Sequence, residues 1–362
     1  MAAATGHLRL KRPASMLGHV TGDAAATFEP ERGRLFGLAY RLLGSASDAE
    51  DILQDAFLRW ASTDRASIAE PAAWLTTMVT NLCLTFLGST RQRRESYVGT
   101  WLPEPVLTGS GALGPLETAE QRESVSMALL LLCERLTAPE RAVFILHEAF
   151  GYRYGEIARI LDRSEAGCRQ LGHRAAERVS GERLAASVSL GAPDPAGAMR
   201  WRRLIDQFLA AAAAGDVAGL EQVLSEDVVS WSDGGGKFPA GLRPVVGRAK
   251  VARLLAALVP KMLPGGPAAG GMVRATAGIR HAGIELSAAE VNGSAAMLAW
   301  SGGILIGVIV PEIGPDGITA LYTIANPDKL VFTARQAAGL PRSGVLTPSG
   351  PTPSRNADLS GQ

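Results

Sequence analysis

The chain has 362 residues, which predicts two or three domains, and its net charge of +1 excludes nucleic-acid binding through one uniformly basic surface. Any such binding must come from local patches. The three cysteines, Cys83, Cys133 and Cys168, are widely spaced and form no CxxC pair, so neither a disulfide framework nor a metal site is expected. The longest apolar runs, 127–133 and 304–310, are short for a bilayer span. We therefore expect a cytoplasmic protein with no membrane segment and no cofactor.

The N-terminal part of the chain predicts an all-α domain. Residues 1–27 show no sustained periodicity and are expected to form a disordered tail, whereas apolar residues recur at helical spacing over 28–95. A last helix of this domain is expected to start after Pro71 and to run into the basic cluster RQRR at 91–94. We expect its apolar residues, including Trp74, to face the domain core.

One predicted helix in this domain has two different faces. The segment Ser47–Glu50 matches a capping box and predicts a helix that begins at Asp48. Asp48, Asp51 and Asp55 fall on one face of this helix. Its opposite, apolar face consists of Leu53, Phe57 and Trp60. The helix is therefore expected to pack with one face and to present an acidic face outward.

A proline- and glycine-rich linker over 96–116 separates this domain from a second helical domain over 117–186. The linker contains the sequence WLPEPV at 101–106, which cannot form a helix because its prolines break the pattern. Within the second domain, two short helices flank the turn DRS at 162–164, which is the layout of a helix-turn-helix. Ser164 is expected to cap the second of them.

The second helix of this motif is a candidate for DNA recognition. Residues 153–183 contain seven arginines against five acids. Side chains that can reach phosphates and base edges lie within two turns of the cap: Arg169, Gln170, His173 and Arg174. A plain three-helix core with a solvated basic face is the alternative, and DNA binding is favoured. Gly167 and Gly172 each cost the helix roughly 1 kcal/mol, so either another surface approaches the backbone there or the helix is soft until bound.

A second boundary over 187–198 precedes an α+β domain over 199–332. Two amphipathic helices, at about 199–214 and 217–224, are followed by short strands separated by glycine turns. The last three strands are expected to form an antiparallel meander. Residues 333–362 are rich in Pro, Ser, Gly and Thr and are expected to form a disordered tail.

The two helical segments resemble the paired domains of an extracytoplasmic-function sigma factor of the sigma-70 family. The resemblance rests on DAEDILQDAFLRW in the first domain and on the helix-turn-helix in the second. Three further motifs resemble the SigJ-like subgroup, whose members carry a fused SnoaL-like domain of the NTF2-like fold. These motifs are WLPEPV at 101–106, DGGGK at 233–237 and NPDKL at 326–330.

The resemblance implies roles for particular residues. The acidic helix would dock on the clamp helices of core RNA polymerase through Asp48, Asp51, Gln54 and Asp55. The minus-ten element would be bound by Trp74, Asn81, Arg91, Arg93 and Arg94, although for Trp74 a core position is slightly favoured. The minus-thirty-five element would be read in the major groove by Arg163, Ser164, Arg169, Gln170, His173 and Arg174.

The DGGGK segment has several possible functions. A phosphate-binding loop is excluded, because Lys237 is followed by Phe238 rather than by Ser or Thr. An enzymatic site is disfavoured, because the domain has a single histidine, His281. A hairpin without a partner is the plain alternative. With the resemblance, docking on the sigma domains is favoured, since glycines allow close backbone approach.

The implied regulatory contact is intramolecular. It would hold the C-terminal domain against the first helical domain and the linker. The linker residues are Trp101, Leu102, Pro103, Glu104 and Pro105, and their partners are Asp233, Gly234, Gly235, Gly236, Lys237, Asn326, Pro327, Asp328, Lys329 and Leu330. We therefore expect a sigma factor that binds core RNA polymerase and promoter DNA under the control of its fused domain. Two alternatives stay open: a regulator whose α+β domain binds an unknown small ligand, and a SnoaL-like enzyme fused to a DNA-binding module.

Overall fold

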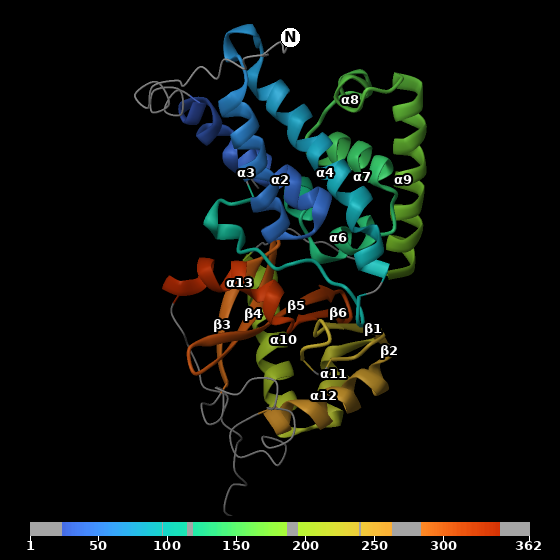
Figure 1. Ribbon diagram of the computed structural model, residues 1–362. Helices are drawn as coiled ribbons and strands as arrows, with labels where there is room; N and C mark the ends of the chain where they lie inside the picture. Colours follow the sequence, from blue (N-terminus) through green and yellow to red (C-terminus); the bar gives the residue numbers. More distant parts are fainter. Residues whose placement is uncertain are drawn as a thin grey trace, which may run out of the picture.

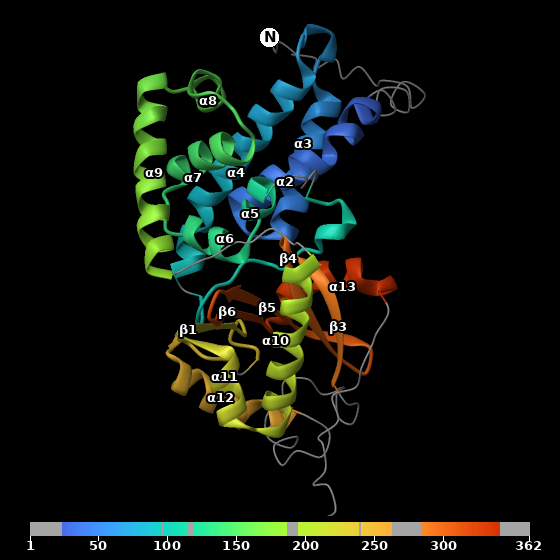
Figure 2. The same cartoon turned by 180° about the vertical axis from the view of Figure 1, so that it is seen from behind.

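The computed structural model describes residues 24–95, 97–113, 119–186, 195–238, 240–262 and 284–340. Helices make up one half of the molecule, and a sheet with its own helices makes up the other (Figure 1). The view from behind shows the same two halves, with α10 running along the sheet (Figure 2). His281 and most of the two predicted tails lie outside the described residues.

Three helices form the first domain, as the periodicity predicts. They are α2 (Arg32–Leu43), α3 (Ala46–Ser62) and α4 (Pro71–Glu95), with the 3-10 turns η1 (Glu29–Glu31) and η2 (Arg65–Ser67). Gly44 ends α2 in the left-handed conformation, with a φ of 67°. The predicted tail over 1–27 is wrong at its end: residues 24–28 are helical, and the buried Ala24 accepts a hydrogen bond from the Trp60 indole at 3.1 Å.

The second domain contains the expected helix-turn-helix. Its elements are α5 (Ala119–Glu123), α6 (Met127–Cys133), α7 (Ala138–Phe144), the π-helical turn η4 (Ile145–Ala149), α8 (Tyr154–Leu161) and α9 (Glu165–Ala186). Asp162 makes the turn between α8 and α9 with a φ of 50°. The linker before this domain is extended and contains the 3-10 turn η3 (Thr108–Ser110).

The two helical domains share one hydrophobic core, in which α4 packs against α7 and α8. By length and composition alone, Pro71–Ser89 of α4 could also cross a membrane, with a mean hydropathy of 1.2. Leu75, Val79 and Leu82 of this segment are buried in the shared core. Packing between the domains therefore accounts for its apolar character.

The C-terminal domain combines helices with a six-stranded sheet. Its helices are α10 (Pro195–Ala214), α11 (Val217–Val223), α12 (Arg248–Met262), α13 (Pro327–Gln336) and the 3-10 turn η6 (Ala337–Gly339). Its strands are β1 (Leu224–Asp233), β2 (Val245–Val246), β3 (Ile284–Val291), β4 (Ser294–Ser301), β5 (Ile304–Gly314) and β6 (Gly317–Ile324). The strand order is β2-β1-β6-β5-β4-β3, and the β4-β5-β6 meander is antiparallel, as predicted. Among the strand pairs within the described residues, β1 and β6 are the parallel pair.

The two faces of the sheet have different partners. Successive residues of β6, such as Leu321 and Tyr322, belong to two separate cores, because neighbouring side chains in a strand point to opposite faces of the sheet. One core contains α10, α11 and α12. The other contains α13 together with Leu102 of the linker and Met127 of α6. The C-terminal domain therefore packs against both the linker and the second helical domain.

The predicted end of the C-terminal domain at residue 332 is too early, because η6 follows α13 and Ala337 still belongs to the sheet core. Helix α13 continues to Gln336, and Thr333 is fully buried. The Thr333 hydroxyl donates a hydrogen bond to the Pro105 carbonyl of the linker. Its burial depends on a residue far away in the sequence, which local composition could not reveal.

Candidate functional site

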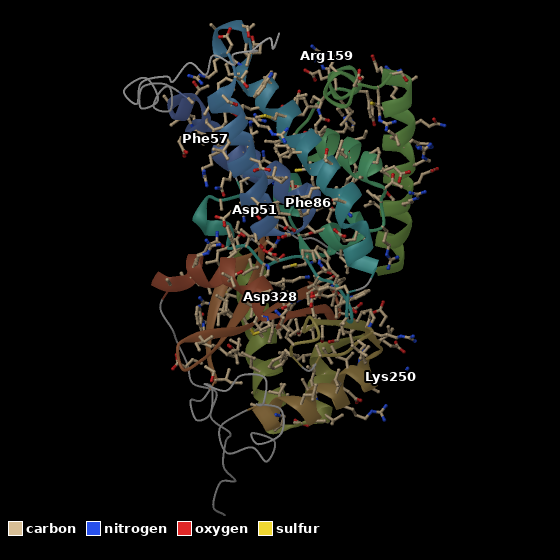
Figure 3. All side chains as sticks on the ribbon, in the orientation of Figure 1. Asp51, Phe57, Phe86, Arg159, Lys250 and Asp328 are labelled. Atoms are coloured by element: carbon tan, nitrogen blue, oxygen red, sulfur yellow. The ribbon has the colours of Figure 1, made fainter. Side chains whose placement is uncertain are left out.

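The acidic face of α3 is exposed, as the sequence predicts. Asp51, Gln54 and Asp55 lie on the exposed side of the helix, and Asp48 is half-buried at its start. Figure 3 shows Asp51 on this helix, in the helical half of the molecule. Sequence reasoning missed Leu58, which is 59% exposed and falls seven residues after Asp51 on the same stripe. The stripe therefore combines acidic side chains with one apolar side chain.

The predicted start of α3 at Asp48 is wrong. The helix begins at Ala46, and its N-cap is Ser45, whose hydroxyl accepts from the Asp48 amide at 3.1 Å. Ser47 does not cap this helix. Its hydroxyl instead donates to the carboxylate of Glu104, at 2.7 Å from Oε1.

Glu104 of the linker occupies the N-terminus of α3. Its Oε2 accepts hydrogen bonds from the amides of Ala46 at 2.9 Å and Ser47 at 3.0 Å, and its Oε1 accepts from the Ser45 hydroxyl at 2.9 Å. A carboxylate satisfies the free amides at a helix start and interacts favourably with the helix dipole. The linker is therefore fixed to the first helical domain by a capping interaction.

The predicted minus-ten residues on α4 lie in different environments. Trp74 is half-buried and packs on Trp60 with ring centroids 5.4 Å apart, so it has the core position that the sequence slightly favours. Asn81 is exposed, and its Nδ2 lies 3.5 Å from the Ile160 carbonyl of α8. The side chains of Arg91, Arg93 and Arg94 lie outside what the structure describes.

Most of the predicted recognition residues are exposed at the start of α9. Ser164 caps this helix, as expected, by accepting from the Gly167 amide at 3.1 Å. The exposed members are Arg163, Ser164, Arg169, Gln170 and His173. Arg169 pairs with Glu165, and His173 lies 3.4 Å from Glu177. These acids lie one helical turn away, so a DNA phosphate would have to replace them.

Arg174 contacts the helical core. Its Nε lies 3.2 Å from Glu140, a side chain that is 3% exposed, and Arg178 lies 2.5 Å from the same carboxylate. Burial alone would raise the pKa of Glu140, but hydrogen bonds from Thr137 and the two arginines lower it. Arg174 therefore attaches α9 to α7.

The structure accounts for Gly172, one of the two glycines inside α9. A Cβ at this position would lie 2.8 Å from the Tyr154 hydroxyl.

Asp233 forms the centre of the contact between the C-terminal domain and the linker. The carboxylate is 1% exposed and accepts four hydrogen bonds: from Tyr97 at 2.6 Å, the Leu102 amide at 2.9 Å, Lys329 at 2.7 Å and the Gly235 amide at 3.0 Å. Burial and the neighbouring Asp233 raise the pKa of Tyr97, so its hydroxyl stays protonated and donates.

Lys329 of α13 completes this buried cluster. Its ammonium group lies 4.0 Å from the centroid of the Trp101 ring and also bonds to the Leu102 carbonyl. The Trp101 ring in turn lies against Gly44, where a Cβ would be 2.7 Å from it. The cluster thus joins α13, the linker and the end of α2.

The three glycines of DGGGK lie where side chains would collide with neighbours. A Cβ at Gly234 would be 2.1 Å from the Phe238 carbonyl, and one at Gly235 would be 2.3 Å from Asn326. Gly236 packs against Val98 of the linker region, 3.2 Å from the position of a Cβ. Gly236 therefore lies close to the linker, whereas Gly234 and Gly235 allow close approach within their own domain.

The NPDKL segment forms the start of α13. Asn326 caps the helix by accepting from the Asp328 amide at 3.2 Å, and its Nδ2 donates to the Tyr97 hydroxyl at 2.8 Å. Asp328 pairs with Lys237 at 2.5 Å on the surface. Leu330 is buried in the sheet core. All three motifs singled out in the sequence therefore meet at one interface.

Helix α13 also touches the first helical domain, through residues that lie beyond the predicted NPDKL motif. Phe332 stacks on Phe36 of α2 with ring centroids 5.5 Å apart. Arg335 lies 3.0 Å from Glu50 of α3. Nothing in the local sequence of α13 indicates these partners.

The C-terminal domain contains one carboxyl group with an unusual pKa. Burial raises the pKa of Glu312 to about 7, and a hydrogen bond with the buried Tyr322 partly opposes this. Among the residues that the structure describes, no group of three or more His, Cys, Asp or Glu side chains could hold a metal ion.

Comparison with protein families gives two matches to the helical half. Residues 27–94 match Sigma-70 region 2, and residues 126–179 match Sigma-70, region 4. The second match contains the helix-turn-helix. Both agree with the domains expected from the sequence motifs.

Known relatives extend the similarity to the C-terminal domain. The chain is 40% identical over 305 residues to the ECF RNA polymerase sigma factor SigJ of Mycobacterium tuberculosis, covering 83% of this chain and 91% of that protein. It is 30% identical to the probable ECF RNA polymerase sigma factor SigI of the same species, covering 84% and 94%. The crystal structure of M. tuberculosis SigJ matches with a TM-score of 0.62 and 33% identity, covering 85% of this chain and 98% of that one. The chain therefore belongs to the extracytoplasmic-function RNA polymerase sigma factors.

Proposed function

We propose that this sigma factor docks on core RNA polymerase through the exposed stripe of α3. Asp51, Gln54, Asp55 and Leu58 are all exposed, while the opposite side of the helix is buried in the domain core. A stripe that combines charge with an apolar side chain suits a protein partner, because charge guides encounter and apolar contact adds affinity. The proposed partner surface is the clamp helices of the polymerase.

Promoter DNA is the second proposed partner. We assign the minus-thirty-five element to the exposed start of α9, where Arg169 and Gln170 can contact base edges in the major groove. Asn81 and the arginines at the end of α4 are assigned to the minus-ten element. Arg174 is assigned to supporting α9 rather than to DNA, since it bonds to the buried Glu140.

The C-terminal domain, which we class as SnoaL-like, is proposed to control how far the two helical domains separate. The two promoter elements lie about 25 base pairs apart, which is about 85 Å along the duplex. In this structure α4 and α8 are in direct contact. The domains must therefore part for both elements to be bound, and the C-terminal domain holds the linker between them. The observation that carries this proposal is the bonding of Asp233 to Tyr97 and the Leu102 amide.

Run-off transcription with core polymerase tests the sigma assignments. Replacing Asp51 and Asp55 by Lys should weaken core association, because it reverses the charge of the exposed stripe. Asp206→Lys is the matched control, since Asp206 is exposed on α10. For DNA, Arg169→Ala should reduce discrimination between cognate and scrambled promoters by about 10- to 100-fold. Unchanged core affinity in the double variant would contradict the docking surface.

Ligand binding or catalysis in the C-terminal domain is the second candidate function. It is supported by the raised pKa of Glu312, because a carboxyl group with a pKa of about 7, hydrogen-bonded to Tyr322, can accept or donate a proton at neutral pH. Its test is Glu312→Gln in the transcription assay with and without a cell extract of small molecules. A response to the extract that Glu312→Gln abolishes would support it, and equal output under all four conditions would contradict it. We propose a cytoplasmic location for either function.

A further inference from the structure

The turn between β3 and β4 is buried, although hairpin turns usually lie at the surface. Asn292 and Gly293 form it with φ angles of 53° and 73°, the conformation of a tight two-residue turn that favours Asn-Gly. Asn292 is 0% exposed. By contrast, the next turn of the same sheet, Gly302 and Gly303, has similar φ angles of 55° and 81° and is exposed.

The Asn292 side chain reaches three parts of the sigma region at once. Its Nδ2 donates to the Tyr40 hydroxyl of α2 at 2.6 Å and to the Val125 carbonyl, just before α6, at 2.8 Å. Its Oδ1 accepts from the Val106 amide of the linker at 3.0 Å. Both donor hydrogens and the acceptor of the amide are therefore used. An Asp side chain of the same size could not donate to Tyr40 or Val125.

The backbone of the turn strengthens this attachment. The Asn292 amide donates to the Val106 carbonyl at 3.0 Å, and the Gly293 amide donates to the Thr108 hydroxyl at 2.8 Å. A Cβ on Gly293 would lie 2.9 Å from the Arg122 carbonyl, so the turn fits closely against the second helical domain. The Asp233 carboxylate, in comparison, bonds to the linker and to its own domain, without a bond to either helical domain.

We propose that Asn292 is a positioning residue for promoter recognition, which holds the first helical domain, the linker and the second helical domain in the closed arrangement. The inference rests on the proposed control of domain separation by the C-terminal domain. Loss of the three side-chain hydrogen bonds should shift the ratio of closed to separated chains at least about tenfold toward separation. The separated form should then accept promoters with a wider range of spacer lengths.

Energy transfer between dyes on the full-length chain tests this directly. Cysteines at Ser62 of α3 and Ser180 of α9, both exposed, would carry the dyes, since Cys83, Cys133 and Cys168 are buried. Asn292→Gly removes the amide and keeps a residue that tolerates positive φ, and Asn292→Asp keeps the size. Both variants should show lower transfer efficiency than the wild type. Gly302→Ala is the control, because it strains an equivalent turn that is exposed.

The outcomes separate this inference from the proposed function. Wild-type transfer efficiency in folded Asn292→Gly and Asn292→Asp chains would overturn the role of Asn292, even if the chain directs transcription normally. If the wild type fails in run-off transcription while the variants lose transfer, the proposed function fails and the positioning of the domains stands. In a promoter series with altered spacers, Asn292→Gly should retain output at spacers where the wild type loses it. Identical spacer profiles would contradict the link to promoter recognition.

Discussion

The aspartates of α3 and Asp233 of β1 show two opposite uses of the same side chain. Asp51 and Asp55 are exposed, whereas Asp233 is 1% exposed and accepts four hydrogen bonds, one of them from a buried lysine. An exposed carboxylate can exchange water for a partner at little cost, while a buried one depends on all its donors. The comparison indicates that the side chains proposed to contact other molecules are accessible to solvent. The contact between Asp233 and the linker, in contrast, is buried and depends on several hydrogen bonds at once.

Removing the buried carboxylate should have the largest effect. Asp233→Ala leaves the Lys329 ammonium buried and without its carboxylate, which typically costs about 3–5 kcal/mol. We expect a matching loss in urea unfolding of the full chain and faster proteolysis at the linker. Lys237→Ala is the control, because its pair with Asp328 is exposed, and it should cost less than about 1 kcal/mol. Equal effects of the two substitutions would remove the distinction between buried and exposed pairs.

A side chain in the glycine loop should have the next largest effect. Gly235→Ala would place a Cβ 2.3 Å from Asn326 at a φ of +60°, so both strain and collision oppose it. We expect a loss of about 2–3 kcal/mol in thermal unfolding. Gly151→Ala is the matched control, because Gly151 has a φ of +69° and a Cβ there would meet no atom within 4 Å. The difference between the two variants measures the collision alone, and no difference would mean that the loop moves aside freely.

Loss of the linker cap should be smaller. Glu104→Ala removes the acceptor of the Ala46 and Ser47 amides and should cost about 1–2 kcal/mol, as helix caps do. Hydrogen exchange should accelerate in the first turn of α3 and leave α9 unchanged. The exposed Glu226→Ala serves as the control. Uniform acceleration in both helices would indicate global destabilisation instead of a local capping role.

The smallest expected effect is the contribution of Glu312 to the pH dependence of stability. The pKa of Glu312 is raised to about 7, so its contribution to stability is fully present below the ordinary glutamate pKa and is lost as pH rises through about 7. One unit of pKa difference corresponds to about 1.4 kcal/mol for a group that is fully shielded from water. The Glu312 side chain is half-buried, so solvent screening reduces its effect below those of the substitutions above. We expect the melting temperature to fall between pH 5 and 8 in the wild type. Glu312→Gln should flatten that slope, and a slope that persists in the variant would assign it to other groups.

Much of the fold could be predicted from periodicity. Helical spacing indicated the sigma helices, the DRS turn indicated the helix-turn-helix, and glycine turns between apolar runs indicated the meander. The three motifs at the interface were found through their resemblance to the SigJ-like subgroup. These features are local, and local spacing is what sequence patterns record.

The features that were missed depend on distant partners. Ser47 and Glu50 matched a local capping pattern. In the structure, however, the Ser47 hydroxyl donates to the carboxylate of Glu104, 57 residues away, and Ser45 is the N-cap of α3. Asn-Gly at 292–293 predicts a tight turn and says nothing about the helical domains that cover it. The end of the C-terminal domain was misplaced for the same reason, since α13 contacts Phe36 and Pro105.

During synthesis, the linker is made well before the residues of the C-terminal domain that bind it. Leu102 leaves the ribosome 131 residues before its acceptor Asp233, and Val106 leaves 186 residues before Asn292. At about 5–20 residues per second, the linker is made roughly 7–40 s before these partners, and the second helical domain, which ends at Ala186, is complete roughly 2–20 s before them. Every newly made chain therefore passes through a period in which its two DNA-binding domains are complete and not yet restrained. In a rapidly growing cell, nascent chains would form a short-lived pool with different promoter access from the finished protein.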